Sequence, residues 1–180
     1  MMKTLSLMAL LGCGTLTADL VNFKNDPKQM IGKITNDGVM GGLSKGKLKR
    51  NESGSMIFSG ILSLENNGGF SLWRVAEGKW NLSAAKGVKL RVKGDGRTYK
   101  LRLATNERYR FGRVAFQADL PTKKGEWTDV TVPFFKLQAS WRGRELKNKF
   151  DPAEVREIGI ILADKTPGIF KLEVASIEAE

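Results

Sequence analysis

The sequence predicts an all-β protein, built as an antiparallel β-sandwich. Short segments alternate apolar and polar residues with a period of two, which is typical of strands with one buried face. Clusters of Gly, Asn, Asp and Pro separate these segments, and no long amphipathic helix lies between them. We expect one short helical turn at Asp151-Pro152-Ala153-Glu154, which combines an N-cap, a proline at the first helical position and an acidic first turn.

Residues 1–18 resemble an export signal, because a short positive region precedes an apolar run too short to span a bilayer. Leu10-Leu11-Gly12-Cys13 resembles the bacterial lipoprotein box, in which the cysteine is lipidated, and we favour this interpretation. Cleavage after Ala18 by an ordinary signal peptidase is the second alternative, and a hydrophobic helix that stays in the fold is the third. We therefore expect an exported, periplasmic protein with one domain over residues 19–180, attached peripherally to the membrane if Cys13 is lipidated.

The stretch Asn36-Asp37-Gly38-Val39-Met40-Gly41-Gly42-Leu43-Ser44 is the segment around which the domain is organised. Asn-Asp-Gly favours a tight turn, and Gly41-Gly42 indicates positive φ or close approach of another segment. Val39 and Met40 are expected to fill a core, so we favour a bend that closes one end of the sandwich. The alternative is a binding surface, either an anion nest or a cation site such as calcium at Asp37, although no spacing of oxygen ligands is diagnostic. The candidate binding residues of this stretch are Asn36, Asp37, Gly41, Gly42 and Ser44.

The other strands follow from alternation and turn residues. Leu20, Val21 and Phe23 are expected to contact the core at the start of the domain. Pro133 lacks a backbone donor and so indicates an edge or a strand end. Residues 105–110 are expected to form a loop. Strands are expected at residues 56–64, 70–75, 111–116, 127–135, 158–162 and 170–174.

The clearest predicted hairpin joins residues 88–92 to residues 99–103 through Gly94-Asp95-Gly96. Like charges across neighbouring strands repel, and folding alone gives no reason to gather them. The cations form either a solvated face or an electrostatic platform for anionic lipid, lipopolysaccharide or an acidic partner. This predicted basic face consists of Lys89, Arg91, Lys93, Lys100 and Arg102.

Composition restricts the chemistry of the 180-residue chain. Histidine is absent and Cys13 is the only cysteine, which excludes Ser-His-Asp and Cys-His catalysis and the usual zinc sites. This does not exclude a catalytic pair of carboxylates, as in glycosidases. However, no pair of Asp or Glu residues lies in a recognisable catalytic motif. We therefore expect no enzymatic activity, no cofactor and no metal.

Charge indicates the class of partner. Lys and Arg total 30 against 19 Asp and Glu, a formal charge of +11, which favours anionic partners. Because the leader directs export, nucleic acid is not an expected partner. The expected partner is a protein of the envelope, or an anionic glycan or lipid surface.

Trp141 is the aromatic residue best placed to contact a ligand, because Arg142 and Arg144 flank it in a polar segment. The alternative is a tryptophan folded back onto the sandwich. Trp73, Trp80 and Trp127 are expected in the core or at its rim.

The glycine-rich stretch resembles the signature of the complex I intermediate-associated protein family, which comprises the mitochondrial assembly factor for NADH:ubiquinone oxidoreductase and its bacterial relatives. A tryptophan often seen shortly before that signature is missing here, and Met30 and Ile31 supply the apolar bulk. Together the matching motifs cover roughly residues 22–177. The others, in the expected order, are Phe58-Ser59-Gly60 with Leu62, Asn67-Gly68-Gly69-Phe70, Gly94-Asp95-Gly96 with Tyr99, Trp127 with Val132-Pro133-Phe134, Arg142-Gly143, and Ile158-Gly159 with Gly168 and Phe170.

The resemblance implies a galactose-binding-like jelly roll and a non-enzymatic assembly or chaperone role. Bacterial complex I carries its peripheral arm in the cytoplasm, so an exported protein could not assist that arm. We therefore expect a binding or assembly module of the cell envelope that acts through protein–protein interaction. The alternative is a module that binds carbohydrate or anionic lipid with the sandwich loops or the basic sheet face.

Overall fold

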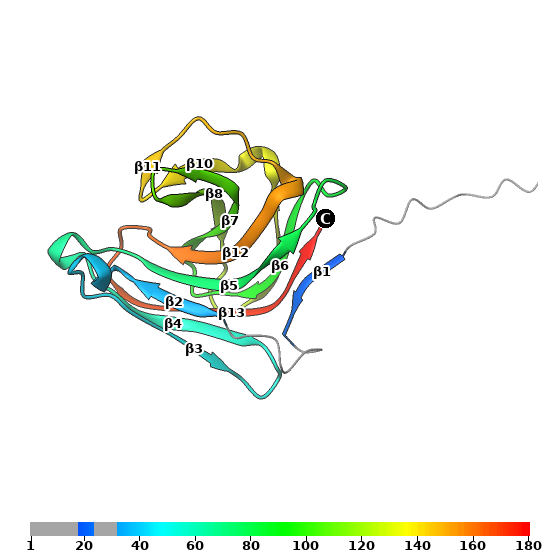
Figure 1. Cartoon of the computed structure of the whole chain (residues 1–180). Helices are drawn as coiled ribbons and strands as arrows, with labels where there is room; N and C mark the ends of the chain where they lie inside the picture. The colour runs from blue at the N-terminus through cyan, green and yellow to red at the C-terminus, as the bar shows by residue number, and fades with distance from the viewer. Residues whose placement is uncertain (1–17, 24–31) are drawn as a thin grey trace, which may run out of the picture.

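Two antiparallel sheets packed face to face form the protein, which confirms the predicted all-β sandwich (Figure 1). The structure, a computed structural model, describes residues 18–23 and 32–180. Cys13, Met30 and Ile31 therefore lie outside the described residues. No helix in the described part of the chain is long and apolar enough to cross a membrane.

Sheet A has the strand order β3-β4-β13-β6-β9, and β1 pairs with β13. Sheet B has the order β11-β10-β8-β7-β12-β5-β2. The strands of sheet A are β1 (Ala18–Asn22), β3 (Lys45–Arg50), β4 (Met56–Leu62), β6 (Gly87–Lys93), β9 (Trp127–Pro133) and β13 (Gly168–Ala179). Those of sheet B are β2 (Lys33–Asn36), β5 (Ser71–Trp80), β7 (Thr98–Tyr109), β8 (Gly112–Pro121), β10 (Gln138–Trp141), β11 (Arg144–Glu145) and β12 (Val155–Leu162). Short 3-10 turns are η1 (Asp37–Met40), η2 (Glu65–Asn67), η3 (Phe134–Lys136) and η4 (Pro152–Glu154).

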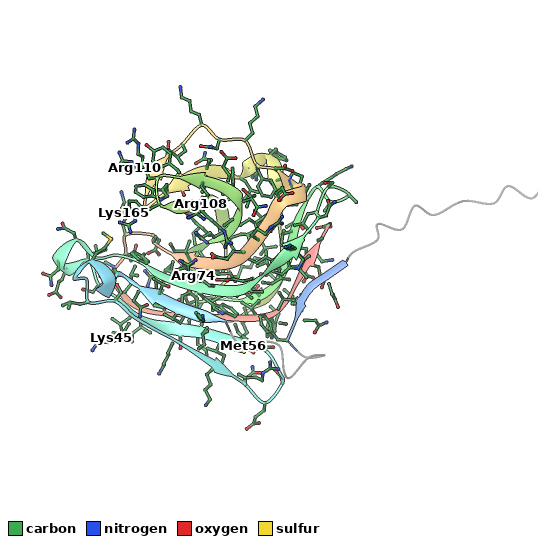
Figure 2. All side chains as sticks on the ribbon, viewed as in Figure 1. Lys45, Met56, Arg74, Arg108, Arg110 and Lys165 are labelled. Atoms are coloured by element: carbon green, nitrogen blue, oxygen red, sulfur yellow. The ribbon has the colours of Figure 1, made fainter. Side chains whose placement is uncertain are left out.

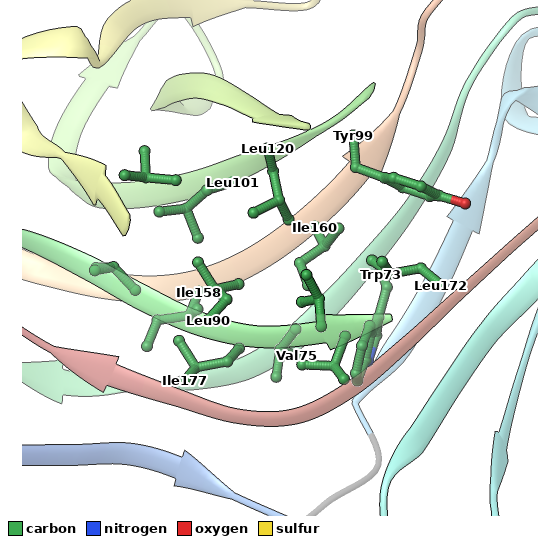
Figure 3. Close-up of a cluster of buried hydrophobic side chains, with 14 of the residues drawn as sticks. Trp73, Val75, Leu90, Tyr99, Leu101, Leu120, Ile158, Ile160, Leu172 and Ile177 are labelled. Atoms are coloured by element: carbon green, nitrogen blue, oxygen red, sulfur yellow. The ribbon is translucent and has the colours of Figure 1, made fainter. Parts of the chain in front are cut away.

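The main core lies between the two sheets, where every second residue of each strand points inward. Figure 3 shows Leu101, Ile158 and Ile160 of sheet B above Leu90 and Ile177 of sheet A, and all five are fully buried. The same core takes up Val21, Phe23 and Trp73, as expected. A smaller cluster of Val114, Phe116 and Ala139 lies where β8 and β10 meet.

The predicted hairpin of residues 88–103 is wrong. β6 pairs with β9 and β13 in sheet A, whereas β7 pairs with β8 and β12 in sheet B. Gly94-Asp95-Gly96 is therefore a corner that carries the chain from one sheet to the other. Asp95 anchors this corner, because its carboxylate accepts hydrogen bonds from the backbone N–H groups of Arg97 and Lys171 at 3.1 and 2.8 Å.

The predicted basic face is consequently split between the two sheets. Lys89, Arg91 and Lys93 belong to β6 in sheet A, and Lys100 and Arg102 to β7 in sheet B. Most of these cations also have acidic partners: Lys89–Glu178 at 3.3 Å, Arg91–Asp129 and Lys100–Asp119 at 3.2 Å, and Arg102–Glu157. They do not form one platform.

Other local expectations are partly confirmed. Pro133 ends β9, an edge strand, and Asp151 caps η4 by accepting a 2.9 Å hydrogen bond from the N–H of Ala153. The loop expected at residues 105–110 is instead the far end of β7, which extends to Tyr109. Met40, expected in the core, is 60% exposed, because it lies in the turn η1. Leu64, expected at the end of a strand over residues 56–64, is 42% exposed, because β4 ends at Leu62.

Candidate functional site

Asp37 of the glycine-rich stretch is fully buried and ties two turns together. Its carboxylate accepts hydrogen bonds from the N–H and Oγ of Ser44 at 2.9 and 2.5 Å, and from the N–H groups of Gly69 and Phe70 at 2.6 and 3.2 Å. Burial alone would raise the pKa of Asp37, but these hydrogen bonds outweigh burial and hold the pKa below its ordinary value. The side chain is thus a charged staple between η1 and the segment after η2.

The neighbouring residues of the stretch serve the same junction. Asn36 Oδ1 accepts hydrogen bonds from the N–H of Gly46 at 3.1 Å and from Ser71 Oγ at 2.7 Å. Gly41 has φ +91°, and a Cβ on Gly42 would lie 2.4 Å from Cγ of Asp37. The stretch is a bend that closes one end of the sandwich, and its polar side chains are engaged internally.

The cation alternative gains no support from this arrangement. Both carboxylate oxygens of Asp37 already accept hydrogen bonds, and the other acidic residue of the two turns, Glu65, is exposed. Among the described residues, no group of three or more His, Cys, Asp or Glu side chains could hold a metal ion.

The outer face of sheet B, opposite the core, carries a polar row that crosses the strands. Registered pairing places Arg74, Gly159, Arg102, Gln117 and Gln138 side by side from β5 to β10. Small residues occupy the next row, where Ala104 pairs with Ala115 and Ala115 with Ser140. The guanidinium and carboxamide groups therefore project above the surface formed by the neighbouring small side chains. They can act as hydrogen-bond donors there.

Glu157 organises the arginines in this row. Its carboxylate is 3% exposed and accepts hydrogen bonds from Arg74 Nη1, at 2.5 Å, and from Arg102 Nη1. Burial lowers the pKa of Arg102, and the attraction of Glu157 opposes that shift. Register shifts in β12 on either side of Glu157 bring the carboxylate between the two guanidinium groups.

Two further arginines, without ion-pair partners in the described part of the chain, lie on β7 and β8 beyond the row of small residues. Arg108 and Arg113 are register partners in the β7–β8 pair, both are exposed, and neither forms an ion pair with a described residue. Like charges placed directly opposite are destabilising, so this pair has a cost that no ion pair among the described residues offsets. We name Arg74, Arg102, Arg108 and Arg113 the arginine face; Figure 2 labels Arg74 and Arg108 on sheet B.

An aromatic cluster lies at the neighbouring strand ends. Trp141 contacts Tyr109 and Phe111 edge to face, with ring centroids 5.4 and 5.0 Å apart. The guanidinium carbon of Arg110 lies 5.7 Å from the Trp141 ring, and that of Arg142 lies 5.3 Å from it. We name these five residues the aromatic rim.

Apart from the basic face, the expected binding residues thus fall in two places. Trp141, Arg142 and Arg144 lie at the rim of sheet B, whereas the glycine-rich residues form a structural junction at the end where η1 and η2 meet. Trp141 is half-buried in its cluster, between the two alternatives, while Phe111 is 64% exposed. Arg74, Arg108, Arg113, Gln117 and Glu157 were not predicted. The run Arg108-Tyr109-Arg110-Phe111-Gly112-Arg113 interleaves basic and aromatic residues. This pattern could have indicated Arg108 and Arg113 from the sequence.

A family model described as complex I intermediate-associated protein 30 matches residues 21–174 of the chain.

Solved structures similar to this fold include carbohydrate-binding modules. A family 11 module from Clostridium thermocellum, in complex with a β-1,3-1,4-mixed-linked tetrasaccharide, has a TM-score of 0.64 at 13% identity, covering 91% of this chain and 94% of that one. A family 30 module has a TM-score of 0.59 at 13% identity, covering 91% and 87%. At such identities the likeness bears on the fold, which is a jelly-roll sandwich.

Proposed function

The chain belongs to the complex I intermediate-associated protein 30 family, and from this premise we propose that it is a non-catalytic binding module that recognises an acidic glycan on sheet B. The observation that carries the proposal is the arginine face beside the aromatic rim, where Arg108 and Arg113 oppose each other without an acidic partner among the described residues. A fold shared with carbohydrate-binding modules supports a ligand of this class.

The two features suit the two parts of an acidic sugar. Guanidinium groups bind carboxylate and sulfate groups with paired, charge-assisted hydrogen bonds. Aromatic rings offer a flat apolar surface to the C–H face of a pyranose ring, and Phe111 is 64% exposed at the rim. Gln117 and Gln138, which follow Arg102 in the polar row, add donors and acceptors for hydroxyl groups.

The residues of this face favour binding over catalysis. Glu157, its one fully buried carboxylate, accepts hydrogen bonds from two arginines, and its register partner in β5, Glu77, is exposed rather than held with it in the row. Glycoside hydrolysis needs a pair of carboxyl groups across the scissile bond. The proposed role of Glu157 is to hold Arg74 and Arg102 in place.

The test compares acidic and neutral polysaccharides. The protein should bind alginate or heparin, and the double substitution Arg108→Ala/Arg113→Ala should weaken that binding by about tenfold or more, since charge-assisted hydrogen bonds are lost. Phe111→Ala should weaken it less. Affinity electrophoresis and calorimetry measure these changes.

Lys49→Ala/Arg91→Ala is the charge-matched control, because it also removes two cations, both on sheet A, and leaves the Arg108–Arg113 pair and the aromatic rim intact. Equal losses in both double variants would show that net charge, not the arginine face, attracts the polymer. Tight binding of neutral mixed-linkage β-glucan with no preference for alginate would contradict the acidic class.

A second candidate is the role that the family's description carries, assistance in assembling a complex through a protein partner. It is favoured by the family match over nearly all described strands. Export to the periplasm, with lipidation at Cys13, would place that partner in the envelope. A protein retained from envelope extract by the parent and by Arg108→Ala/Arg113→Ala alike, with no glycan binding by either, would support this candidate over the first.

A further inference from the structure

Exposed aliphatic side chains gather at one end of the sandwich, away from the arginine face. In the described part of the chain, five of the seven exposed large hydrophobic side chains lie here. Ile169 is 81% exposed and Met40 60%. We name this set the aliphatic end; it consists of Met40, Leu43, Ile61, Leu64 and Ile169.

Pairing and hydrogen bonds show that these side chains share one surface. Ile61 and Ile169 are register partners in the β4–β13 pair. Ser44 Oγ accepts a 3.0 Å hydrogen bond from the N–H of Ser63, which brings Leu43 beside Leu64. The Asn66 side chain donates to the carbonyl of Gly41 at 3.2 Å, so the turn that carries Met40 rests on η2. Figure 1 shows η1 and η2 together at the left of the view.

Lysines border the aliphatic end on sheet A. Lys45 is the register partner of Ile61, and Lys47 and Lys171 are both register partners of Ser59. Lys165 lies in the β12–β13 turn, which continues into Pro167 and Gly168 beside Ile61 and Leu64; Figure 2 labels both Lys45 and Lys165. None of these four lysines forms an ion pair with a described residue. Glu65 is an exposed acidic residue at this end and lines a shallow pocket with Ile61 and Leu64.

We propose that the aliphatic end and its lysine border dock on an anionic lipid bilayer. The aliphatic side chains would enter the interface while the lysines meet phosphate groups, the arrangement in which apolar and electrostatic contributions act together. The Asp37 staple supports this docking. Its carboxylate accepts hydrogen bonds from the N–H groups of Ser44, Gly69 and Phe70. These donors therefore remain hydrogen-bonded when the turns enter the low-dielectric part of a bilayer.

Composition favours lipid over the other occupants of an apolar surface. Protein interfaces concentrate their binding energy in Trp, Tyr and Arg and are poor in Lys, whereas this surface is aliphatic and lysine-bordered. A symmetric contact with a second copy would bring the lysine border against itself. An anionic bilayer complements both the apolar and the basic side chains.

Vesicle flotation of the full-length protein tests the proposal, with Cys13→Ser in every sample so that no acyl chain contributes. The parent should float with vesicles that contain phosphatidylglycerol and not with phosphatidylcholine alone, and salt should weaken the binding. Ile61→Ser/Ile169→Ser should weaken it by about tenfold or more. Phe135→Ser, at an 85% exposed aromatic on η3, is the matched control and should leave it unchanged. Circular dichroism establishes that each variant is folded.

Each of the following outcomes would overturn the proposal. The parent could fail to distinguish the two vesicle compositions, or Ile61→Ser/Ile169→Ser could float as well as the parent. Sedimentation could reveal self-association that this double variant abolishes while flotation persists, which would identify a second copy as the occupant. Cross-linking could reveal a protein whose capture, rather than flotation, depends on the two isoleucines.

Discussion

Gly38 and Gly42 belong to the same short stretch, yet a methyl group would have opposite consequences at the two positions. At Gly42 it would lie 2.4 Å from Cγ of Asp37, a side chain that four hydrogen bonds hold still. At Gly38 nothing lies within 4 Å, and φ is not in the left-handed region. We expect Gly42→Ala to lower the free energy of unfolding by about 1–3 kcal/mol, and Gly38→Ala to change it by less than about 0.5 kcal/mol. Urea unfolding measures both changes in the free energy of unfolding. Equal changes for the two variants would mean that the Asp37 side chain can move aside at little cost.

Asp37 should make the stability of the protein depend on pH. Because its folded pKa is depressed below the ordinary value of 3.8, its contribution is fully present above that value and is lost as pH falls through the folded pKa. Asp37→Asn replaces one accepting oxygen with a donor and leaves backbone N–H groups without a partner. We expect it to cost about 2–3 kcal/mol at neutral pH.

The exposed Asp119, paired with Lys100, provides the control for that measurement. Asp119→Asn should change the free energy of unfolding by less than about 0.5 kcal/mol. The difference between Asp37→Asn and the parent should shrink in unfolding experiments below pH 3.8. A difference that stays constant into the acid range would show that Asp37 is not ionised in the folded protein.

At the scale of single elements, the register shifts of β12 have a clear structural consequence. Its register shifts turn Glu157 between Arg74 and Arg102, where the three groups neutralise part of their charge away from water. Removing the carboxylate alone would leave Arg102, whose side chain is 11% exposed, without its counter-ion. We expect Glu157→Ala to cost about 3 kcal/mol.

A double substitution separates the cost of leaving Arg102 unpaired from the net contribution of the Glu157–Arg102 ion pair to the free energy of unfolding. Glu157→Leu/Arg102→Leu should recover much of the loss, because no uncompensated charge remains. The exposed pair Lys100–Asp119 on the same sheet serves as reference, and its disruption should cost under about 1 kcal/mol. Chemical denaturation that found Glu157→Ala no worse than this reference would contradict the role assigned to Glu157.

The connection between β6 and β7 shows why part of the fold escaped prediction. Alternation identified both strands correctly, since each presents one face to the same core. In a sandwich, a hairpin within one sheet and a corner between two sheets produce the same alternation on either side of the same turn residues. The distinction lies in the pairing with β9, β13, β8 and β12, which local sequence does not encode.

The same reasoning applies to the candidate site. The glycine-rich junction was recognisable because its residue types are constrained locally, by φ at Gly41 and by close approach at Gly42. The arginine face was not, because Arg74, Arg102 and Arg113 come from three strands that meet through long-range pairing. Trp141 and Arg142 could be singled out as candidates from the sequence, since they share one short segment.

Over the whole molecule, the two proposed surfaces belong to different sheets. The arginine face is on sheet B, and the aliphatic end with its lysine border is on the outer edge of sheet A. Separation of this kind would let the protein rest on one surface and hold a ligand on the other. The seven-strand sheet B curves away from sheet A in Figure 1, so its far strands stand clear of that surface.

The predicted lipid anchor gives this arrangement a direction. Cys13 precedes β1, which pairs with β13 in sheet A and lies at the opposite side of Figure 1 from η1 and η2. If Cys13 is lipidated, the first strand after the anchor and the aliphatic end both belong to sheet A, and a bilayer that meets both lies along the outer face of that sheet. The exposed lysines of β3 and β13 should then be shielded: Lys45, Lys47, Lys49 and Lys171.

Acetylation footprinting of the lipidated protein in phosphatidylglycerol vesicles measures this shielding. The lysines of β3 and β13 should react several times more slowly than in the Cys13→Ala form free in solution, because a headgroup layer excludes the reagent and counter-ions lower its access. Lys147 and Lys149, exposed between β11 and η4 beside sheet B, should react equally in both forms and serve as the internal control. Equal labelling of all six lysines would mean that the lipid merely tethers the sandwich. Selective protection of Lys147 and Lys149 would mean that sheet B, rather than sheet A, faces the bilayer, and would place the arginine face against phosphate instead of glycan.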